Sequence, residues 1–484
     1  MKKRTNYIII LSLGVLSFFS CKKKDLLSPV PQTSIADVTA FDSPSRIAQQ
    51  VNSLYAGLKN GNFYGGRYQI FGDIRGEDFL NETTNVVTGF DVWLLNCLGT
   101  SQNSVKNLWA QAYYTINLCN LFLEGMTAKG NSIVGSTLAA NYNGEARLIR
   151  ALSYFSLLQF YARPYADGNG SKPGLPLRLT GIKSSGSSDL ARSTVAQIYA
   201  QILSDLNFAE TNLPLTYTSA TLNTSRAHRN TAIALKVRVY LTMQDYANVI
   251  VEANKICPQS VAPFSATTGV ANTMNATIGP VFTTYTTAES ILSLPMTTTA
   301  GDNPGTQNQL GFYWSRSTGN GEYSLNPSGI IANSGWLSTD ARRAFIATVS
   351  GKPYLNTKFA APSPFTDWAP VIRYPEVMLS LAEALARTNS GVNARALALL
   401  NAVRQRSDAT TTLAPANQTA LIDAILLERR IEFLGEGLRN NDLLRLLQPI
   451  PAKGAAGLKN PSDQGYIWPI SSDELSLNHL MTDN

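Results

Sequence analysis

The chain has 484 residues, 44% of them hydrophobic, which is enough to bury a large core in one big domain or two smaller ones. Its formal net charge is +7, but Lys2, Lys3 and Arg4 lie at the extreme N-terminus and no basic run follows residues 22–24. The composition therefore argues against nucleic-acid binding.

Residues 1–20 have the pattern of a lipoprotein signal peptide. A basic start is followed by an apolar stretch from Tyr7 to Phe19, which is too short to span a bilayer, and by Ser20 before Cys21. A Cys after a small residue is typical of bacterial lipoprotein cleavage sites, where the thiol receives acyl chains such as palmitate. Each buried methylene contributes roughly 0.8 kcal/mol to membrane binding. The alternative is a plain secretory signal with a chance Cys.

A tether over residues 21–40 and a helical region over residues 41–256 are predicted next. Pro29 and Pro31 block helix formation in the tether. Ser43 is the expected N-cap of the first helix, with Pro44 at its first position. Apolar residues at helical spacing predict further helices, over 109–123, 144–164, 194–213 and 231–256.

Several of the predicted helices form pairs. Residues 231–256 read as two helices joined by a tight turn near Gln244 and Asp245, and residues 373–388 and 393–407 form another pair. Such pairs are similar to tetratricopeptide units of about 34 residues. A single hairpin cannot bury its own apolar face, so the hairpins must stack. The sequence predicts a mostly α fold, a tetratricopeptide-like helical-hairpin bundle with a loop-rich, helix-poor insertion.

Two stretches lack a helical period and are rich in Gly, Asn, Thr and Ser, namely residues 60–103 and 257–365. Long irregular loops on a rigid scaffold are where binding residues tend to sit. Sugar rings pack on Tyr and Trp, whose rings have an apolar face and a polar edge. These loops carry such aromatic residues: Tyr64, Tyr68, Trp93, Tyr313, Trp314, Tyr323 and Trp336.

Beyond Cys21 the chain has Cys97, Cys119 and Cys257, without C-x-x-C spacing. This trio fits neither a disulfide framework nor a metal site. Buried free thiols are expected, although pairing of Cys97 with Cys119 is left open. The two histidines lie far apart in the sequence, and the usual metal and nucleotide motifs are missing from it, so no metal and no cofactor is predicted.

The stretch ERRIEFLGEGLRNNDLLRL, residues 428–446, is densely charged. Glu428, Glu432 and Glu436 recur at i, i+4 spacing, an arrangement that destabilises a helix unless the carboxylates are paired. The natural partners of its acidic residues lie in the same stretch: Arg429, Arg430, Arg439 and Arg445, with Asp442 three residues from both Arg439 and Arg445. A structural ion network is favoured over a glycosidase-like pair of catalytic carboxylates.

Nine features, in order, resemble the SusD/RagB family of outer-membrane nutrient-binding lipoproteins. They are Cys21, EARLIRALSYFSLLQFYARPY, ARSTVAQIYAQILSDLNFAETNLP, AIALKVRVYLTMQDY, ESILSLP, IRYPEVMLSLAEALA, LNAVRQRS, ERRIEFLGEGLRNNDLLR and IWPISSDEL. The resemblance covers nearly the whole chain. It implies four tetratricopeptide-like units, a variable loop-rich region over residues 257–365 and a C-terminal SusD/RagB helical region over residues 366–484.

The resemblance also implies a function. Such a protein is held by its lipid at the outer membrane, facing the cell exterior, and caps a SusC-like TonB-dependent transporter. It passes glycans, or in some members peptides, to that transporter and is not an enzyme. Two departures from the family pattern stand out. Lys22 to Lys24 replace the usual acidic run after Cys21, and Pro375 stands where Tyr or Ala is frequent.

The predicted ligand-binding residues combine loop aromatics with polar neighbours: Asp73, Arg75, Trp93, Asn96, Tyr313, Trp314 and Tyr323. Other aromatic residues are assigned to the scaffold: Trp109, Tyr113, Tyr154 and Trp468. Three hypotheses remain: a lipid-anchored binding subunit for nutrient import, which is favoured, an anchored hydrolase, and a scaffold or adhesin that binds only protein. Within the first, a peptide ligand is the alternative to a glycan.

Overall fold

The computed structural model describes residues 39–184, 186, 188–305 and 307–484. The predicted signal peptide, Cys21 and most of the tether therefore lie outside the described residues. The helices are α2 (Pro44–Leu58), α3 (Arg67–Ile74), α4 (Phe90–Trp93), α5 (Asn107–Gly125), α6 (Asn131–Val134), α7 (Ser136–Tyr161), α8 (Val195–Asn212), α9 (Ala220–Ser225), α10 (Arg229–Thr242), α11 (Tyr246–Asn254), α12 (Leu310–Trp314), α13 (Tyr374–Thr388), α14 (Ala394–Ser407), α15 (Gln418–Glu432), α16 (Arg439–Arg445) and α17 (Ser472–Leu477). The strands are β1 (Phe79–Asn81), β2 (Pro173–Pro176), β3 (Arg192–Thr194), β4 (Ser290–Leu294), β5 (Tyr323–Leu325), β6 (Ile346–Val349), β7 (Lys352–Leu355) and β8 (Ala369–Arg373).

The predicted helix starts are confirmed by their capping contacts. The Ser43 side chain accepts a hydrogen bond from the Arg46 backbone N–H, and Pro44 opens α2. Thr194 and Gln197 form a reciprocal capping box at the start of α8. Local sequence signals therefore fix where these two helices begin.

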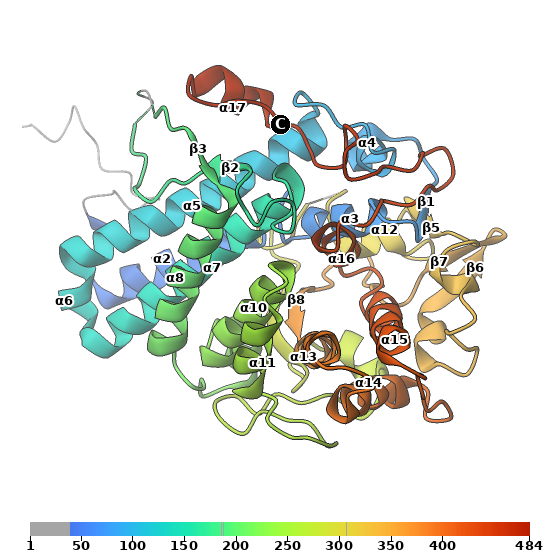
Figure 1. Cartoon of the computed structure of the whole chain (residues 1–484). Helices are drawn as coiled ribbons and strands as arrows, with labels where there is room; N and C mark the ends of the chain where they lie inside the picture. Colours follow the sequence, from blue (N-terminus) through green and yellow to red (C-terminus); the bar gives the residue numbers. More distant parts are fainter. Residues whose placement is uncertain (1–38, 185, 187, 306) are drawn as a thin grey trace, which may run out of the picture.

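The helices pack as a succession of pairs (Figure 1). Helix α7 packs against both α5 and α8, and its last fourteen residues are buried, as its several apolar faces predict. Gln244 has φ of +60° in the tight turn between α10 and α11, and α13 pairs with α14. Pro375 lies in the first turn of α13, where its missing N–H removes no helical hydrogen bond. The mostly α hairpin architecture is confirmed.

The strands form four two-stranded antiparallel sheets within the described residues, and two of them join distant segments. Strand β1, in the 60–103 stretch, pairs with β5 in the 257–365 stretch, with Phe79 opposite Leu325. Strand β4 pairs with β8, which leads directly into α13. Backbone hydrogen bonds thus attach the loop-rich region to the first loop stretch through β5 and to the strand that leads into α13 through β4.

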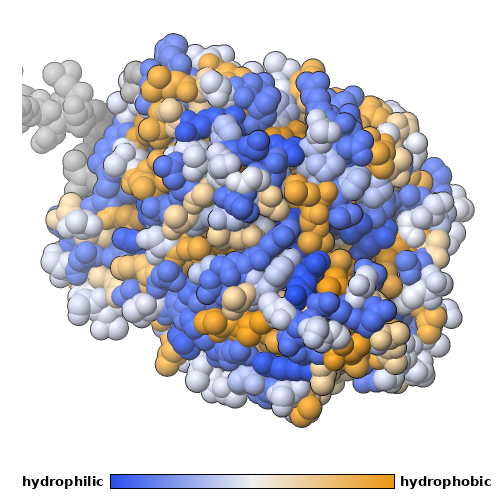
Figure 2. Space-filling view, in the orientation of Figure 1, coloured by the Kyte–Doolittle hydropathy of each residue, from blue (hydrophilic) through white to orange (hydrophobic). Residues whose placement is uncertain are grey.

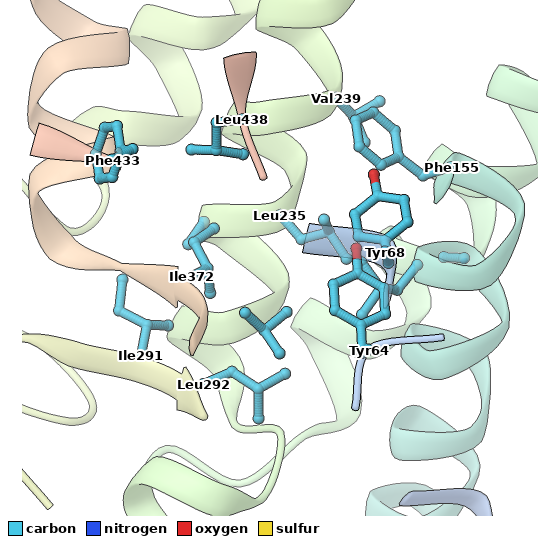
Figure 3. Packing of buried hydrophobic residues seen from close by; sticks show 14 of the residues in the cluster. Tyr64, Tyr68, Phe155, Leu235, Val239, Ile291, Leu292, Ile372, Phe433 and Leu438 are labelled. Carbon is cyan, nitrogen blue, oxygen red and sulfur yellow. The ribbon is translucent and has the colours of Figure 1, made fainter. Parts of the chain in front are cut away.

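The 60–103 stretch is less irregular than its composition predicts. It contains α3, an eight-residue helix in which every residue is buried. Tyr64 and Tyr68 pack against each other with ring centroids 4.5 Å apart, inside the core shown in Figure 3. Trp336 in the second stretch is also buried. These aromatic side chains belong to the core because the loops fold back onto the helices.

The predicted scaffold aromatics lie in or against the same core. Trp109 and Trp468 are buried and both contact the ring of Tyr161. The Tyr154 hydroxyl donates to the backbone oxygen of Arg178, and partly buried Tyr113 packs against Trp109. Their assignment to the scaffold is confirmed.

The three cysteines of the described chain are free and buried. Burial raises the pKa of Cys119 to about 12 and that of Cys257 to about 11. The expectation of free thiols is confirmed, and Cys97 does not pair with Cys119.

Between residues 39 and 484, where the chain is described, no helix combines the length and the apolar character that crossing a bilayer requires. Figure 2 shows hydrophilic and hydrophobic side chains interspersed over one face of the molecule. Single exposed apolar side chains of this kind are normal on a protein surface.

Candidate functional site

Three predicted ligand-binding aromatics in the loop-rich region lie in the interior. Trp314 is fully buried and stacks on Phe79, with ring centroids 4.3 Å apart. The Tyr313 hydroxyl donates to the Gln307 backbone oxygen at 2.9 Å, and the Tyr323 hydroxyl donates to that of Thr88 at 3.0 Å. The prediction that these side chains contact a ligand is corrected: their ring faces and hydroxyls are used inside the fold.

Trp93 at the end of α4 is also buried. Its Nε1 donates to the Phe79 backbone oxygen at 2.8 Å, and its ring edge packs against Gly454. The ammonium of Lys453 lies 6.0 Å from the Trp93 ring centroid. Trp93 therefore joins the first loop to the C-terminal segment instead of facing solvent.

The polar candidates Asp73 and Arg75 are interior groups that hold backbone. Asp73 accepts hydrogen bonds from the N–H groups of Gly437 and Arg439, and burial raises its pKa to about 7. Arg75 donates to the Asn440 side chain at 2.8 Å and to the Tyr466 backbone oxygen at 2.6 Å. Both join α3 to the C-terminal region, so their assignment to ligand contact is corrected as well.

Asn96 is the one predicted ligand residue whose side chain is exposed. It borders a hollow of about 610 Å³ whose walls come from residues 95–99, the 459–469 segment, residues 483–484 and Arg163. We call this the Asn96 hollow. It lies between the first predicted binding loop and the C-terminal segment, which the sequence did not indicate as part of a site.

Backbone contacts fix the shape of the Asn96 hollow. The Ser472 N–H donates to the Gly99 backbone oxygen at 2.9 Å, which holds the 95–99 loop against the C-terminal segment. Gly465 has φ of +90°, and a Cβ there would lie 2.6 Å from the Leu95 backbone oxygen. Only glycine fits this close approach of two loops.

Three uncharged polar side chains at the Asn96 hollow have no hydrogen-bond partner among the described residues. They are the amides of Asn96 and Gln464 and the hydroxyl of Ser462, all of them exposed. Sugar hydroxyl groups require donors and acceptors of this kind. Cys97 closes part of the hollow, and burial raises the pKa of its thiol, which disfavours the reactive thiolate form.

The structure also brings together two aromatic residues that the sequence analysis did not select. Tyr285 and Trp368 are half-buried and their ring centroids lie 5.9 Å apart, with planes at 59°. Trp368 directly precedes β8, and Tyr285 lies in the loop before β4. More than eighty residues separate them in the chain, so no local sequence pattern indicates that they are in contact. The antiparallel pairing of β4 with β8 brings them together.

A groove of about 860 Å³ on the helical face is larger, but its lining offers fewer free groups. Its guanidinium groups are paired, Arg387 with Glu383 and Arg439 with Glu77. Asp442 is likewise bound by arginines from α15 and α16. Most of the charges at this groove therefore stabilise the scaffold.

The acidic residues of the 428–446 stretch belong to a buried ion network, but most of their partners lie elsewhere. Asp442 pairs with Arg429 and Arg445 as predicted. The glutamates instead bind cations from the loop-rich region, from β8 and from α14. These are Arg342 and Arg404 for Glu428, Arg342, Arg373 and Arg406 for Glu432, and Lys358 and Arg373 for Glu436.

The predicted pairing of Arg439 with Asp442 is wrong, because Arg439 binds Glu77 near the N-terminal loop. Arg430 binds Asp78 in the same place. Neighbouring cations hold the pKa of Glu432 far below its ordinary value despite burial. The stretch is a structural frame that ties the C-terminal helices to both loop regions.

The described residues were also compared with the requirements of a metal site and of a glycosidase site. Within residues 39–484 as described, no three His, Cys, Asp or Glu side chains gather in a geometry that could hold a metal ion. Glycosidase chemistry requires two carboxylates that flank the sugar. The two carboxylates at the Asn96 hollow, Asp463 and Asp483, each accept backbone N–H hydrogen bonds.

Comparisons with known proteins agree with this architecture. Residues 25–241 match a family model described as "Starch-binding associating with outer membrane", and residues 354–457 match the SusD family model. SusD-like protein P25 from Formosa agariphila is 26% identical over 260 residues, a match that spans 52% of this chain and 46% of that protein.

Solved structures extend the similarity to nearly the whole chain. A SusD superfamily protein from Bacteroides fragilis is 31% identical, with a TM-score of 0.79 over 91% of this chain and 99% of that one. A laminarin-binding SusD-like protein, 20% identical, shares the fold with a TM-score of 0.71 over 91% of this chain and 99% of that one. The helical pairs, the loop-rich insertion and these matches together place the chain in the SusD family.

Proposed function

We propose that this chain is a cell-surface lipoprotein that binds oligosaccharides without cleaving them and delivers them to a SusC-like TonB-dependent transporter. Membership of a carbohydrate-binding family supports the ligand class. The observation that carries the proposal is the Asn96 hollow, where unpartnered amides and a hydroxyl surround a space large enough for sugar units.

The half-exposed pair of Tyr285 and Trp368 is proposed as an additional sugar-contacting surface. Rings at this degree of exposure can stack on sugar C–H faces without unfolding any part of the core. Neither ring has a hydrogen-bonded polar edge among the described contacts, so both edges are free for ligand hydroxyls.

Binding is tested by titrating the detergent-purified protein with a panel of oligosaccharides and peptides in isothermal calorimetry. We expect a glycan to bind and the double variant N96A/Q464A to weaken that binding by about tenfold, since two hydrogen bonds are removed. Trp368→Ala probes the aromatic pair separately. Binding of peptides alone would favour the peptide-binding alternative, and binding of neither would refute the ligand proposal.

An anchored hydrolase remains the alternative from another class. Asp463 and Asp483 are the two carboxylates at the hollow, and their backbone hydrogen bonds favour a structural role. Incubation of the protein with any glycan that binds, followed by chromatography of the products, decides the matter. Cleavage that is lost in Asp463→Asn or Asp483→Asn would replace the binding proposal.

The anchor and the transporter are separate parts of the proposal. Cys21 is the proposed acylated residue, and the Cys21→Ser variant should leave the membrane fraction and appear in soluble fractions. Delivery to a transporter is tested by cross-linking in intact cells and identifying the captured protein. Recovery of an outer-membrane transporter supports delivery, and recovery of only other proteins supports the scaffold alternative.

A further inference from the structure

Lys459 borders the Asn96 hollow and is half-buried, yet its ammonium has no acceptor among the described residues. Among the described lysines only one other lacks a side-chain partner, and that residue, Lys172, is exposed. The remaining ones bind carboxylates or backbone oxygens, as Lys453 binds the Arg75 oxygen at 2.7 Å. The Lys459 Nζ is not among the buried polar atoms, so this ammonium faces solvent and is open to a ligand, while its apolar stem is partly covered.

The position of Lys459 is fixed by its backbone. Its N–H donates to the Ile450 oxygen at 3.0 Å, and its own oxygen accepts from the Ile450 N–H at 2.8 Å. Its Cε lies 3.6 Å from the point where a Cβ on Gly465 would stand. The side-chain stem therefore lies along Gly465, another residue of the hollow, and the ammonium is held at that wall.

The other charged groups at the hollow are already engaged. Arg163 donates from Nε to Asp167 at 2.6 Å and lies over the Tyr466 ring. Asp463 accepts the Asn460 N–H at 2.8 Å, and Asp483 accepts the Ile470 N–H at 2.7 Å. Neither carboxylate forms an ion pair with Lys459 among the described residues, so its ammonium is free to bind an anion, although both carboxylates keep their negative charge at the hollow.

A further cation lies behind the same wall. Arg75 is buried and donates only to neutral groups, among them the Gly465 backbone oxygen at 3.3 Å, and its Nη1 has no partner. No carboxylate within salt-bridge distance neutralises it among the described residues. Its positive charge adds to the potential that an incoming anion would meet at Lys459.

We propose that Lys459 binds a carboxylate or sulfate ester carried by a sugar, so that the Asn96 hollow prefers acidic oligosaccharides over neutral ones. The inference rests on the proposed glycan-binding function and narrows its substrate class. An ammonium binds such an anion as a point charge, and the neighbouring amides of Asn96 and Gln464 donate to the remaining oxygens.

The test uses matched pairs of oligosaccharides with the detergent-purified full chain. One pair is a uronic-acid hexasaccharide and its methyl ester, and the other is a sulfated galactan hexasaccharide and its desulfated form. We expect one acidic member to bind at least about tenfold more tightly than its neutral partner, the size of one charge-assisted hydrogen bond. The oligosaccharide pair whose two members differ in affinity shows whether the bound anion is a carboxylate or a sulfate ester.

Variants locate the effect. Lys459→Met, which keeps the apolar stem, should abolish the preference, whereas Lys459→Arg should largely retain it and Lys172→Ala should leave it unchanged. Equal binding of acidic and neutral members, or an unchanged preference in Lys459→Met, would overturn this inference while glycan binding itself stands. Failure of every glycan to bind would refute the proposed function and this inference together.

Discussion

Arg445 on α16 binds Glu383 on α13 through two hydrogen bonds, Nη1 to Oε1 at 2.8 Å and Nη2 to Oε2 at 2.7 Å. Its Nε also donates to Asp442 at 2.9 Å, and all three side chains are buried. One guanidinium thus neutralises carboxylates from two helices. Replacement of this planar, bidentate donor by lysine would lose hydrogen bonds to the two carboxylates.

Replacement of Arg445 by Ala should lower the free energy of unfolding by about 3–5 kcal/mol, because Glu383 and Asp442 would remain buried with fewer partners. Urea denaturation followed by circular dichroism measures the change. Lys172→Ala, a substitution at an exposed lysine without a partner, should leave the midpoint nearly unchanged. An equal effect of both variants would contradict the role of the ion network.

Asp73 should make the protein less stable as the pH rises from about 4 to about 7. Its pKa is about 7 when folded and near its ordinary value of 3.8 when unfolded, so the folded state binds the extra proton in this interval. His228, whose folded pKa is lowered to about 4, acts in the opposite direction. The effect of His228 cancels when two proteins that differ only at Asp73 are compared.

The comparison is between wild type and Asp73→Asn, each unfolded in urea at pH 5, 6 and 7. The difference in unfolding free energy between them should change in favour of the variant as the pH rises, since only wild type loses stability through Asp73. A constant difference across the three pH values would show that Asp73 is already ionised in the folded protein.

Gly437→Ala should be more destabilising than Gly391→Ala, although both glycines have left-handed backbone, φ +85° and +78°. The strain of that conformation costs about 1–2 kcal/mol at either position. At Gly437 a Cβ would also lie 2.4 Å from the Gln69 Cα, whereas Gly391 has open space. Displacement of α3 should add about 1–3 kcal/mol, measurable by chemical denaturation.

Trp314→Ala should lower stability by about 3–5 kcal/mol, because it leaves a cavity beside Phe79. Trp314→Phe should cost much less, since the stacked ring is kept and the indole N–H has no partner to lose. Thermal unfolding measures both. If Trp314→Ala kept the wild-type stability but lost glycan binding, the ring would face the ligand after all.

The helical scaffold could be predicted from sequence because its signals are local. The caps at Ser43 and Thr194 and the turn at Gln244 are set by neighbouring residues, and the structure reproduces them. The candidate site depends on long-range contacts. In the interior, Trp314 stacks on Phe79 and Trp93 donates to the Phe79 backbone oxygen, although polar, glycine-rich loops suggested exposure.

Only tertiary folding places Lys459 and Gln464 beside Asn96, about 360 residues earlier in the chain. The same holds for the arginine partners of Glu432, which come from three distant segments. Residue type predicted that this glutamate would be paired. It could not identify the partners, because charge alone does not specify which cations the fold brings near.

The pairing of β1 with β5 has a consequence for the evolution of this protein. Because Leu80 and Ser324 lie opposite each other in one ladder, the first loop and the insertion are joined by a two-stranded sheet. A relative that acquires a new ligand by recombination would have to inherit both segments together. Chimeras that exchange only one of these segments should misfold where β1 pairs with β5. Changes of ligand specificity are therefore expected to arise when both segments are replaced together.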